Sequence, residues 1–478
     1  MPFRNQLASE RQSSVCLLIS VSCLFVLTAA GCAVGPDWQP PQPQVPSGWS
    51  QAAAEPNEAA AQEIIHWWTE FGDSTLTSLV ERAVKSNLDL KQAQARVRQA
   101  RAAQGVAGAG FWPTADFAGS YTRSRSAGPA GTIRNLYQAG LDAAWELDIF
   151  GGTRRDIEAA GADLQAGLED ERDVLVTLGA EVALNYIDLR GFQQQIVIAQ
   201  NNLKAQQHTA ELTRERFRGG FVSALDVANA DSLVATTASQ IPLLESAARQ
   251  TIYALSVLLG LEPLGLVEEL SATSTIPAAP PAVPLGVPSE LLRRRPDVRR
   301  AEAQLHAATA RIGVATADLF PRLTLSGSMG YQNEKFHSLT DWSSRFWSFG
   351  PSVSLPLFNA GRIDSNIKLQ EALRDESLIA YQRTVLIALQ DVENALIAST
   401  KEQEHCKALA DAVAANRKAV ELAGQLYTQG ETDFLNVLEA QRALYVSEDA
   451  VVQSTRSVST DLVALYKALG GGWSIYDL

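Results

Sequence analysis

Residues 147–154 read LDIFGGTR, and residues 355–362 read LPLFNAGR. The shared Leu, Phe and Arg positions of the two stretches differ by 208 in number. Further pairs keep an offset of 208 before these stretches and 210 well after them: Asp89 with Asp297, Gly105 with Gly313, Trp112 with Phe320, Gly220 with Gly430, Val227 with Val437, and Gly260 with Gly470. A unit of about 180 residues is far longer than a solenoid repeat. The chain is therefore predicted to be a duplicated half-protein, with two extra residues between Arg362 and Leu378.

Long stretches without proline follow both motifs. An apolar residue recurs at every seventh position from Leu168 to Phe217, and a mostly apolar series repeats this pattern from Leu378 to Tyr427. A sustained seven-residue repeat is typical of coiled coils, and a helix of about 66 residues is about 100 Å long. Glycine favours the left-handed conformation that ends many helices, so turns are expected at Gly219, Gly220 and Gly430. A second helix would then run back in each copy, which gives helix pairs over about 153–260 and 360–469.

Two hairpins, over about 115–150 and 322–358, precede these helices. In the first, an apolar series from Tyr137 to Ile149 alternates with a largely polar one, so one face of the strand is apolar. Strands of about ten residues with aromatic residues near their ends fit the lipid-facing strands of a membrane β-barrel. Four strands cannot close such a barrel, whose smallest form has about eight. Unpaired edges in lipid cost several kcal/mol for each group, so strands in a membrane would require an oligomer. A soluble hairpin packed on a helix is the alternative.

The N-terminus has the features of a secretory signal. Arg4 and Arg11 precede an apolar stretch from Val15 to Ala30, which ends in Ala29-Ala30-Gly31-Cys32. Small residues before a cysteine resemble a bacterial lipobox, although Leu is usual at the position of Ala29. Cys32 is therefore expected to carry a covalent lipid; the alternative is cleavage near Ala30 with Cys32 unmodified. No later stretch reaches 18 uninterrupted apolar residues, so no helical membrane span is expected.

These features predict the organisation of the chain. It comprises a signal peptide over 1–31, a lipid-anchored extended segment over 32–62, a first repeat over 63–262, a proline-rich linker over 263–288, a second repeat over 289–470 and a tail over 471–478. The expected fold is mainly α with a small β part.

Composition and motifs argue against several functions. A net charge of −13 disfavours general nucleic-acid binding. The arginines of 293–295 and 299–300 are instead expected on the solvated face of the next helix, with Asp297 as its cap. The histidines are scattered, and no HExxH, CxxC, GxSxG or Walker pattern occurs, so neither an enzyme nor a metal or other cofactor is expected.

Four motifs, taken in order with the duplication, resemble the TolC-like outer membrane factors, and in particular their lipoprotein (NodT-type) branch. They are Cys32-x-Val34-Gly35-Pro36-Asp37, Trp67-Trp68-x-x-Phe71-Gly72-Asp73, the stretch from Val287 to Asp297, and Leu469-Gly470-Gly471-Gly472-Trp473. The resemblance implies a homotrimer with a twelve-stranded transmembrane β-barrel in the outer membrane and an α-barrel in the periplasm. It also implies a passive exit duct, to which an inner-membrane transporter supplies energy and whose helical tips a periplasmic adaptor contacts.

The resemblance also assigns roles near the glycine turns, which would form the periplasmic aperture and the adaptor contact. Tyr427 matches a tyrosine of the family's latch, and Asp226 matches a constricting carboxylate. In the second copy the two carboxylate positions hold Asn436, which is uncharged, and Glu439. Thr432 stands where an arginine of the latch is sometimes found. Ordinary solvated helix positions are the alternative for Asp226 and Glu439.

Two classes of function remain open at this stage. The first is an efflux duct, with drugs, metal ions or a secreted protein as cargo. The second is a periplasmic coiled-coil adaptor or scaffold, in which the alternating segments would form a soluble β domain. An arginine placed in mid-strand, at Leu141 or Val353, distinguishes them, because only a lipid-facing strand would reject it.

Overall fold

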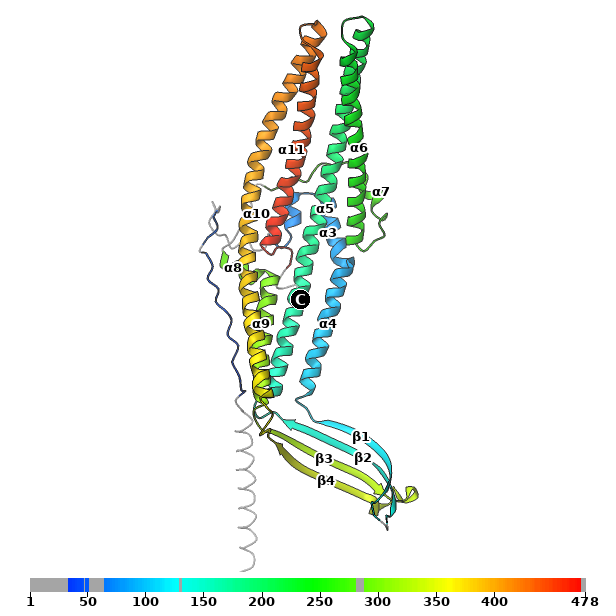
Figure 1. The fold of residues 1–478 in the computed structure, drawn as a ribbon, viewed down its shortest axis with the longest axis vertical. Coiled ribbons are helices and arrows are strands. Elements are labelled where there is room, and N and C mark those ends of the chain that lie inside the picture. The colour runs from blue at the N-terminus through cyan, green and yellow to red at the C-terminus, as the bar shows by residue number, and fades with distance from the viewer. Residues whose placement is uncertain (1–32, 47, 51–63, 129–130, 281–287, 474–478) are drawn as a thin grey trace, which may run out of the picture. The chain divides into compact units, whose positions relative to one another are not determined.

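A computed structural model describes residues 33–46, 48–50, 64–128, 131–280 and 288–473 (Figure 1). The signal peptide and Cys32 lie outside these residues. The helices are α3 (Ser74–Ser86), α4 (Leu88–Ala109), α5 (Gly152–Arg218), α6 (Ala224–Leu258), α7 (Val267–Leu270), α8 (Pro288–Arg294), α9 (Pro296–Ala317), α10 (Arg362–Gln429) and α11 (Phe434–Ala468). The strands are β1 (Thr114–Arg125), β2 (Ile133–Leu147), β3 (Arg322–Asn333) and β4 (Arg345–Ser354). Short 3-10 turns lie at Trp67–Phe71, Phe336–Ser338 and Trp342–Ser344.

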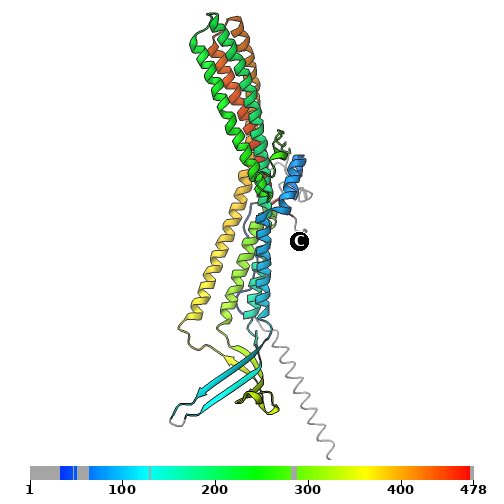
Figure 2. The same ribbon diagram turned by 90° about the vertical axis from the view of Figure 1, so that its right-hand side faces the viewer.

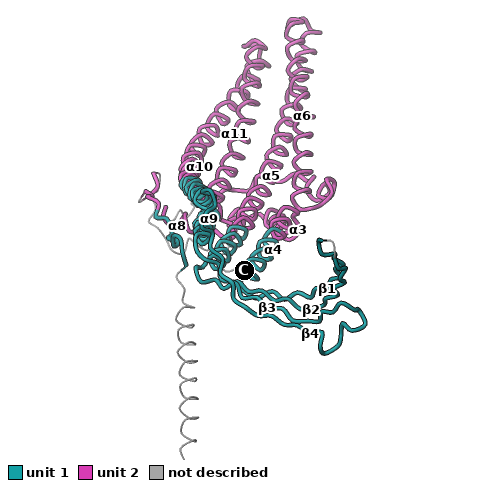
Figure 3. Tube along the Cα trace, turned by 60° about the horizontal axis from the view of Figure 1, so that its bottom comes forward, with its two compact units in different colours: residues 1–42, 96–168, 300–382 teal, residues 43–95, 169–299, 383–478 magenta. Residues whose placement is uncertain are grey.

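The chain divides into two compact units, which Figure 3 shows in different colours. Unit 1 comprises residues 1–42, 96–168 and 300–382, and unit 2 comprises 43–95, 169–299 and 383–478. Each unit takes segments from both sequence repeats. The compact units therefore do not coincide with the two copies of the duplication.

Unit 1 contains one antiparallel sheet with the strand order β1-β2-β3-β4. Phe117, Leu141, Met329 and Trp347 occupy paired positions and form one apolar row across all four strands. Their exposed fractions are 73, 50, 61 and 82%. The adjacent row on the opposite face is polar and consists of Asp116, Asp142, Ser328 and Ser348. The alternation predicted from the sequence is confirmed, and within the described residues the apolar face has little cover.

The two long helices begin at equivalent glycines. Gly151 and Gly361 have φ angles of 82° and 79°, and each carbonyl accepts a first-turn hydrogen bond of 2.9 Å, from Arg155 and Ser365 respectively. These glycines differ by 210 in number, so the two extra residues lie before Gly361, in the loop after β4. The prediction that they lie between Arg362 and Leu378 is wrong. A positive φ fixes the start of the helix, whereas the match between Arg154 and Arg362 does not.

Unit 2 contains two helix pairs, which consist of the C-terminal part of α5 with the whole of α6 and the C-terminal part of α10 with the whole of α11 (Figure 3). Figure 2 shows the same helices from the side. The long helices have 67 and 68 residues and the returning helices 35 each, as expected from the duplication. At Gly220 and Gly430, φ is 78° and 81°. The amide of the next residue donates to the carbonyl five positions earlier, from Phe221 to Arg216 and from Glu431 to Leu426, at 2.9 Å. Both turns thus use the same glycine-dependent helix ending.

Two of the arginines around the start of α9, Arg295 and Arg299, do not lie on a solvated face, contrary to the expectation from the sequence, whereas Arg293 is exposed as expected. Arg295 is buried and pairs with Asp297 at 2.6 Å and with Asp391 at 3.1 Å. Arg299 pairs with the fully buried carboxylate of Glu169 at 2.8 Å. Burial acts to lower the pKa of Arg295, but its bonds to the two aspartates outweigh burial and raise it. Asp297 lies inside the first turn of α9 and holds Arg295 in place.

None of the described helices combines the length and the apolar character needed to cross a bilayer.

Candidate functional site

Apolar side chains from four helices meet next to the glycine turns. We call them the tip cluster: Ala210 on α5, Ala230 and Leu233 on α6, Tyr427 on α10, and Phe434, Val437 and Leu438 on α11. Heptad positions of the long helices and the first three turns of the returning helices supply these residues. The cluster therefore joins the two repeats in unit 2.

Tyr427 is 2% exposed and is held on several sides. Its ring lies 5.7 Å from the Phe434 ring, and the Arg216 guanidinium lies over its face at 4.4 Å. Arg216 Nη1 also donates a short hydrogen bond to the Tyr427 carbonyl. The Tyr427 hydroxyl lies 3.5 Å from Thr213 Oγ1. Two residues of the first repeat thus clamp one residue of the second.

Arg216 was not singled out from the sequence. One signal was available, because a basic residue in the last turn of a helix favours the negative end of the helix dipole. The sequence does not reveal that this arginine crosses to the other repeat. Cation–π contacts of this kind contribute about 0.5–2 kcal/mol.

The other predicted aperture residues lie outside the tip cluster. Asp226 forms a capping box with Ser223, whose amide and hydroxyl donate to Asp226 Oδ2 at 2.9 and 2.8 Å. Asn436, its counterpart in the second repeat, is exposed and donates to Thr432 Oγ1 at 2.8 Å. Glu439 is exposed, 3.9 Å from Arg442. Among the described residues, no hydrogen bond or ion pair links these three side chains to Tyr427.

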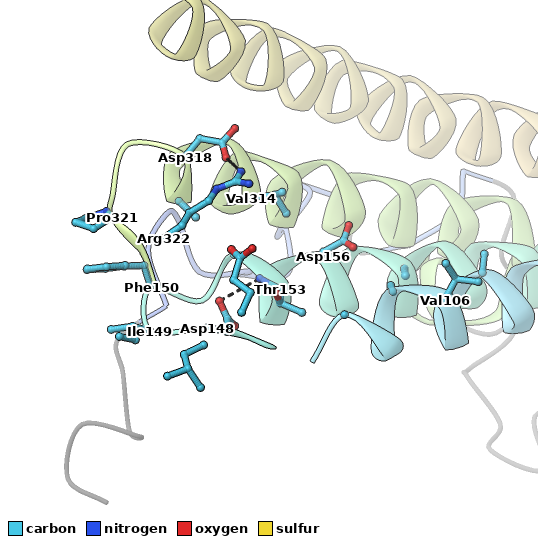
Figure 4. A pocket seen from close by; sticks show the side chains of 18 residues that line it. Val106, Asp148, Ile149, Phe150, Thr153, Asp156, Val314, Asp318, Pro321 and Arg322 are labelled. Atoms are coloured by element: carbon cyan, nitrogen blue, oxygen red, sulfur yellow. Dashed lines mark hydrogen bonds and ion pairs between the residues drawn. The ribbon is translucent and has the colours of Figure 1, made fainter. Parts of the chain in front are cut away.

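A cavity of about 590 Å³ lies in unit 1, where the strands meet the helices (Figure 4). Two of its carboxylates, those of Asp148 and Asp318, already have structural partners. Asp148 accepts hydrogen bonds from the amides of Thr153 and Arg154 at 3.1 and 2.9 Å, which caps the start of α5. Asp318 pairs with Arg322. Across the described part of the chain, no cluster of three or more His, Cys, Asp or Glu residues suits a metal ion.

The segment that follows Cys32 is fixed on unit 1. The Val34 amide donates to the Phe150 carbonyl at 3.0 Å, and Asp37 pairs with Arg155 at 2.6 Å. Trp38 stacks on His306, with 4.7 Å between ring centroids. We call residues 33–38 the N-terminal clasp. The motif of these residues is visible in the sequence, but the contacts that they make are not.

An exposed apolar row across a four-stranded sheet and two long helix pairs with matched turns define an outer-membrane channel subunit. The chain belongs to the outer membrane efflux protein family, whose model matches residues 79–261 and 287–471. The two matched segments start 208 apart and end 210 apart, so the family model also finds the duplication.

Individual relatives cover nearly the whole chain. It is 34% identical over 461 residues to Nodulation protein T of Rhizobium leguminosarum bv. trifolii, covering 94% of this chain and 96% of the relative. It is 31% identical over 468 residues to the toluene efflux pump outer membrane protein TtgF of Pseudomonas putida, covering 95% and 96%. The solved structure of the outer-membrane channel OprN matches with a TM-score of 0.86 and 36% identity, over 92% of this chain and 100% of that one.

These findings confirm the predicted family, the mainly α fold with four strands, and the outer-membrane location. The chain is an outer-membrane efflux protein, and the reading as a periplasmic scaffold is excluded. The comparisons concern the whole chain, so the roles of individual site residues stay predictions.

Proposed function

We propose that the chain forms a homotrimeric exit duct that conducts small molecules passively out of the periplasm. The observation that supports this proposal is the apolar row from Phe117 to Trp347, which is exposed although it spans the whole sheet. Strands β1 and β4 each leave one edge unpaired among the described residues. Four strands with an apolar face and two open edges need strands from further copies before they can enter lipid. Three copies would supply twelve strands.

The partners follow from the same proposal. A duct without a catalytic group needs an energy source elsewhere, which we assign to an inner-membrane transporter. A periplasmic adaptor would contact the helix turns at Gly219, Gly220 and Gly430. A relative is named for toluene efflux, which favours small apolar molecules or drugs as cargo. Metal ions and a secreted protein are the alternatives.

We assign the periplasmic aperture to Asp226, Tyr427, Asn436 and Glu439, and we add Arg216 to this group. Arg216 and Tyr427 hold the two repeats together at the tip, so their separation would be one step in widening it. Cys32, the residue before the N-terminal clasp, would carry the covalent lipid. Because the clasp fixes the following residues on unit 1, the lipid would enter the membrane at a defined place.

The experiment compares an arginine on each face of the sheet. Leu141→Arg places a charge on the apolar row, which costs about 2–4 kcal/mol at the centre of a bilayer. Ser328→Arg, at the paired position next to Asp142, places the same charge on the polar face. We expect the first variant to be lost from the outer-membrane fraction and the second to remain there as a trimer. A Leu141→Arg variant that assembles like the parent protein contradicts a lipid-facing row.

A further inference from the structure

Unit 2 contains a cavity of about 550 Å³, and none of its lining residues belongs to the tip cluster. We call it the Trp473 cavity. It is lined by residues within 65–68 before α3, by α3 itself, by parts of α4 and α5, and by residues that follow α11. Those used below are Trp68, Val84, Leu90, Arg172, Leu175 and Trp473. Its volume lies within the range of about 300–1,000 Å³ that is typical of small-molecule sites.

Two buried donors on this lining lack an acceptor among the described residues. Trp473 is 8% exposed, and its indole Nε1 has no hydrogen-bond partner. The Arg172 side chain is 12% exposed, and its Nε is also without a partner, although its Nη1 donates to Glu169 at 2.6 Å. A buried donor left unpaired costs about 1–3 kcal/mol. Folded proteins rarely leave such groups unpaired unless water or a ligand completes them.

The charge around these donors favours an anion. The guanidinium of Arg172 lies 4.7 Å from the centre of the Trp473 ring, and that of Arg299 lies 5.3 Å from it. Both arginines pair with one buried carboxylate, that of Glu169. The cavity's other charged lining residues, Glu81, Lys85 and Glu171, are exposed or half-buried, where water screens them.

The remaining walls are apolar. Trp68 and Leu90 are buried, and Val84 and Leu175 lie on the helices beside them. An aromatic or branched aliphatic body of modest size would cover these side chains. Apolar walls with a few polar groups that fix orientation are the usual composition of a ligand site.

We propose that the Trp473 cavity binds a small organic acid. Its carboxylate accepts hydrogen bonds from Trp473 Nε1 and Arg172 Nε, and its apolar body lies against Trp68, Val84, Leu90 and Leu175. None of the residues that line this cavity belongs to the aperture group proposed above.

The test uses the full chain purified in detergent and isothermal titration calorimetry. The probe is 1-naphthoate, and the matched control compound is 1-naphthylmethylammonium, which has the same rings and the opposite charge. We expect saturable binding of one naphthoate per chain. The ammonium compound should show only non-saturable partitioning into micelles. Absence of saturable naphthoate binding, or equal saturable binding of both compounds, overturns the proposal.

Variants locate the site. Val84→Trp fills the cavity from its exposed side and should abolish binding, whereas Val257→Trp, on an exposed position of α6 outside the cavity, should leave it unchanged. Trp473→Phe keeps the ring and removes the N–H, and should weaken binding on the order of tenfold, because a hydrogen bond to a charged acceptor is lost. Unchanged affinity in Val84→Trp places the probe elsewhere and overturns the assignment. Unchanged affinity in Trp473→Phe rejects the indole donor.

Discussion

Asn87 and Arg295 each donate a hydrogen bond to the last carbonyl of the returning helix in their own repeat. Asn87 Nδ2 donates to the Leu258 carbonyl at 2.8 Å, and Arg295 Nη1 donates to the Ala468 carbonyl at 3.1 Å. The donors are 208 apart and the acceptors 210 apart, so the duplication has kept the contact and changed its chemistry. Asn87 also caps α4 through Leu90, whereas Arg295 carries a charge that two aspartates neutralise.

This difference predicts unequal costs for removing the two side chains. Arg295→Met removes the hydrogen bond to the Ala468 carbonyl and leaves the Asp297 and Asp391 carboxylates without their partner. Their side chains are 20 and 44% exposed, so water compensates in part, and we expect a loss of about 2–4 kcal/mol, towards the lower end of the effect of breaking a buried pair. Asn87→Leu removes a buried hydrogen bond and a helix cap, with an expected loss of about 1–3 kcal/mol. Unfolding of both purified variants in urea measures the difference. An Asn87→Leu variant less stable than Arg295→Met would contradict the role assigned to the ion pairs.

The tip contact gives a second prediction. Arg216→Ala removes the guanidinium that lies over Tyr427 and donates to its carbonyl, and we expect an easier separation of the repeats and a larger single-channel conductance in planar bilayers. Arg214→Ala is the matched control, because Arg214 forms only exposed ion pairs with Glu211 and Asp231, which water screens. Equal conductance of the two variants would argue that Arg216 does not restrain the tip.

Some of this structure follows directly from the sequence. The seven-residue series and the glycine turns predict α5 and α10 to within a residue or two of their ends, because both depend on local periodicity and backbone conformation. The alternating strands are equally local. Arg216 on Tyr427 depends on which side chains two distant helices bring together, and Arg295 is buried only because Asp297 and Asp391 neutralise it. The sequence alone places the two extra residues wrongly, after Arg362 instead of before Gly361. Identical residues, such as Arg154 and Arg362, do not guarantee the same position in the backbone structure.

The N-terminal clasp is expected to depend on the absence of a side chain at Gly35. Its φ is 90°, and an added Cβ would lie 2.5 Å from the Gly313 Cα. Gly35→Ala should therefore displace the clasp and speed hydrogen exchange of the Val34 amide, whose acceptor is the Phe150 carbonyl. Gly48→Ala is the control, because nothing lies within 4 Å of a Cβ there. Unchanged protection of Val34 in Gly35→Ala would show that the close approach can relax.

The lipid assignment has an independent test. Cys32→Ala removes the only thiol at the end of the signal sequence, so growth with a labelled fatty acid should give no labelled protein. Cys406→Ala, which removes the half-buried thiol on α10, should leave the label unchanged. Label retained in Cys32→Ala would refute the assignment of the acyl site.

Asp461 on α11 predicts a pH-dependent change in stability. Burial raises the pKa of Asp461, and the carboxylate of Glu402 raises it further. A carboxyl whose pKa is higher in the folded state binds its proton more tightly there, so its ionisation destabilises the fold as pH rises through the usual aspartate range. Asp461→Asn should therefore raise the melting temperature at pH 7, and the gain should shrink below about pH 4, where the unfolded aspartate is also protonated. Asp411→Asn, on an exposed position of α10, is the control and should show little change. A gain that grows as pH falls would have the wrong sign, and would mean that the folded protein favours the ionised form of Asp461.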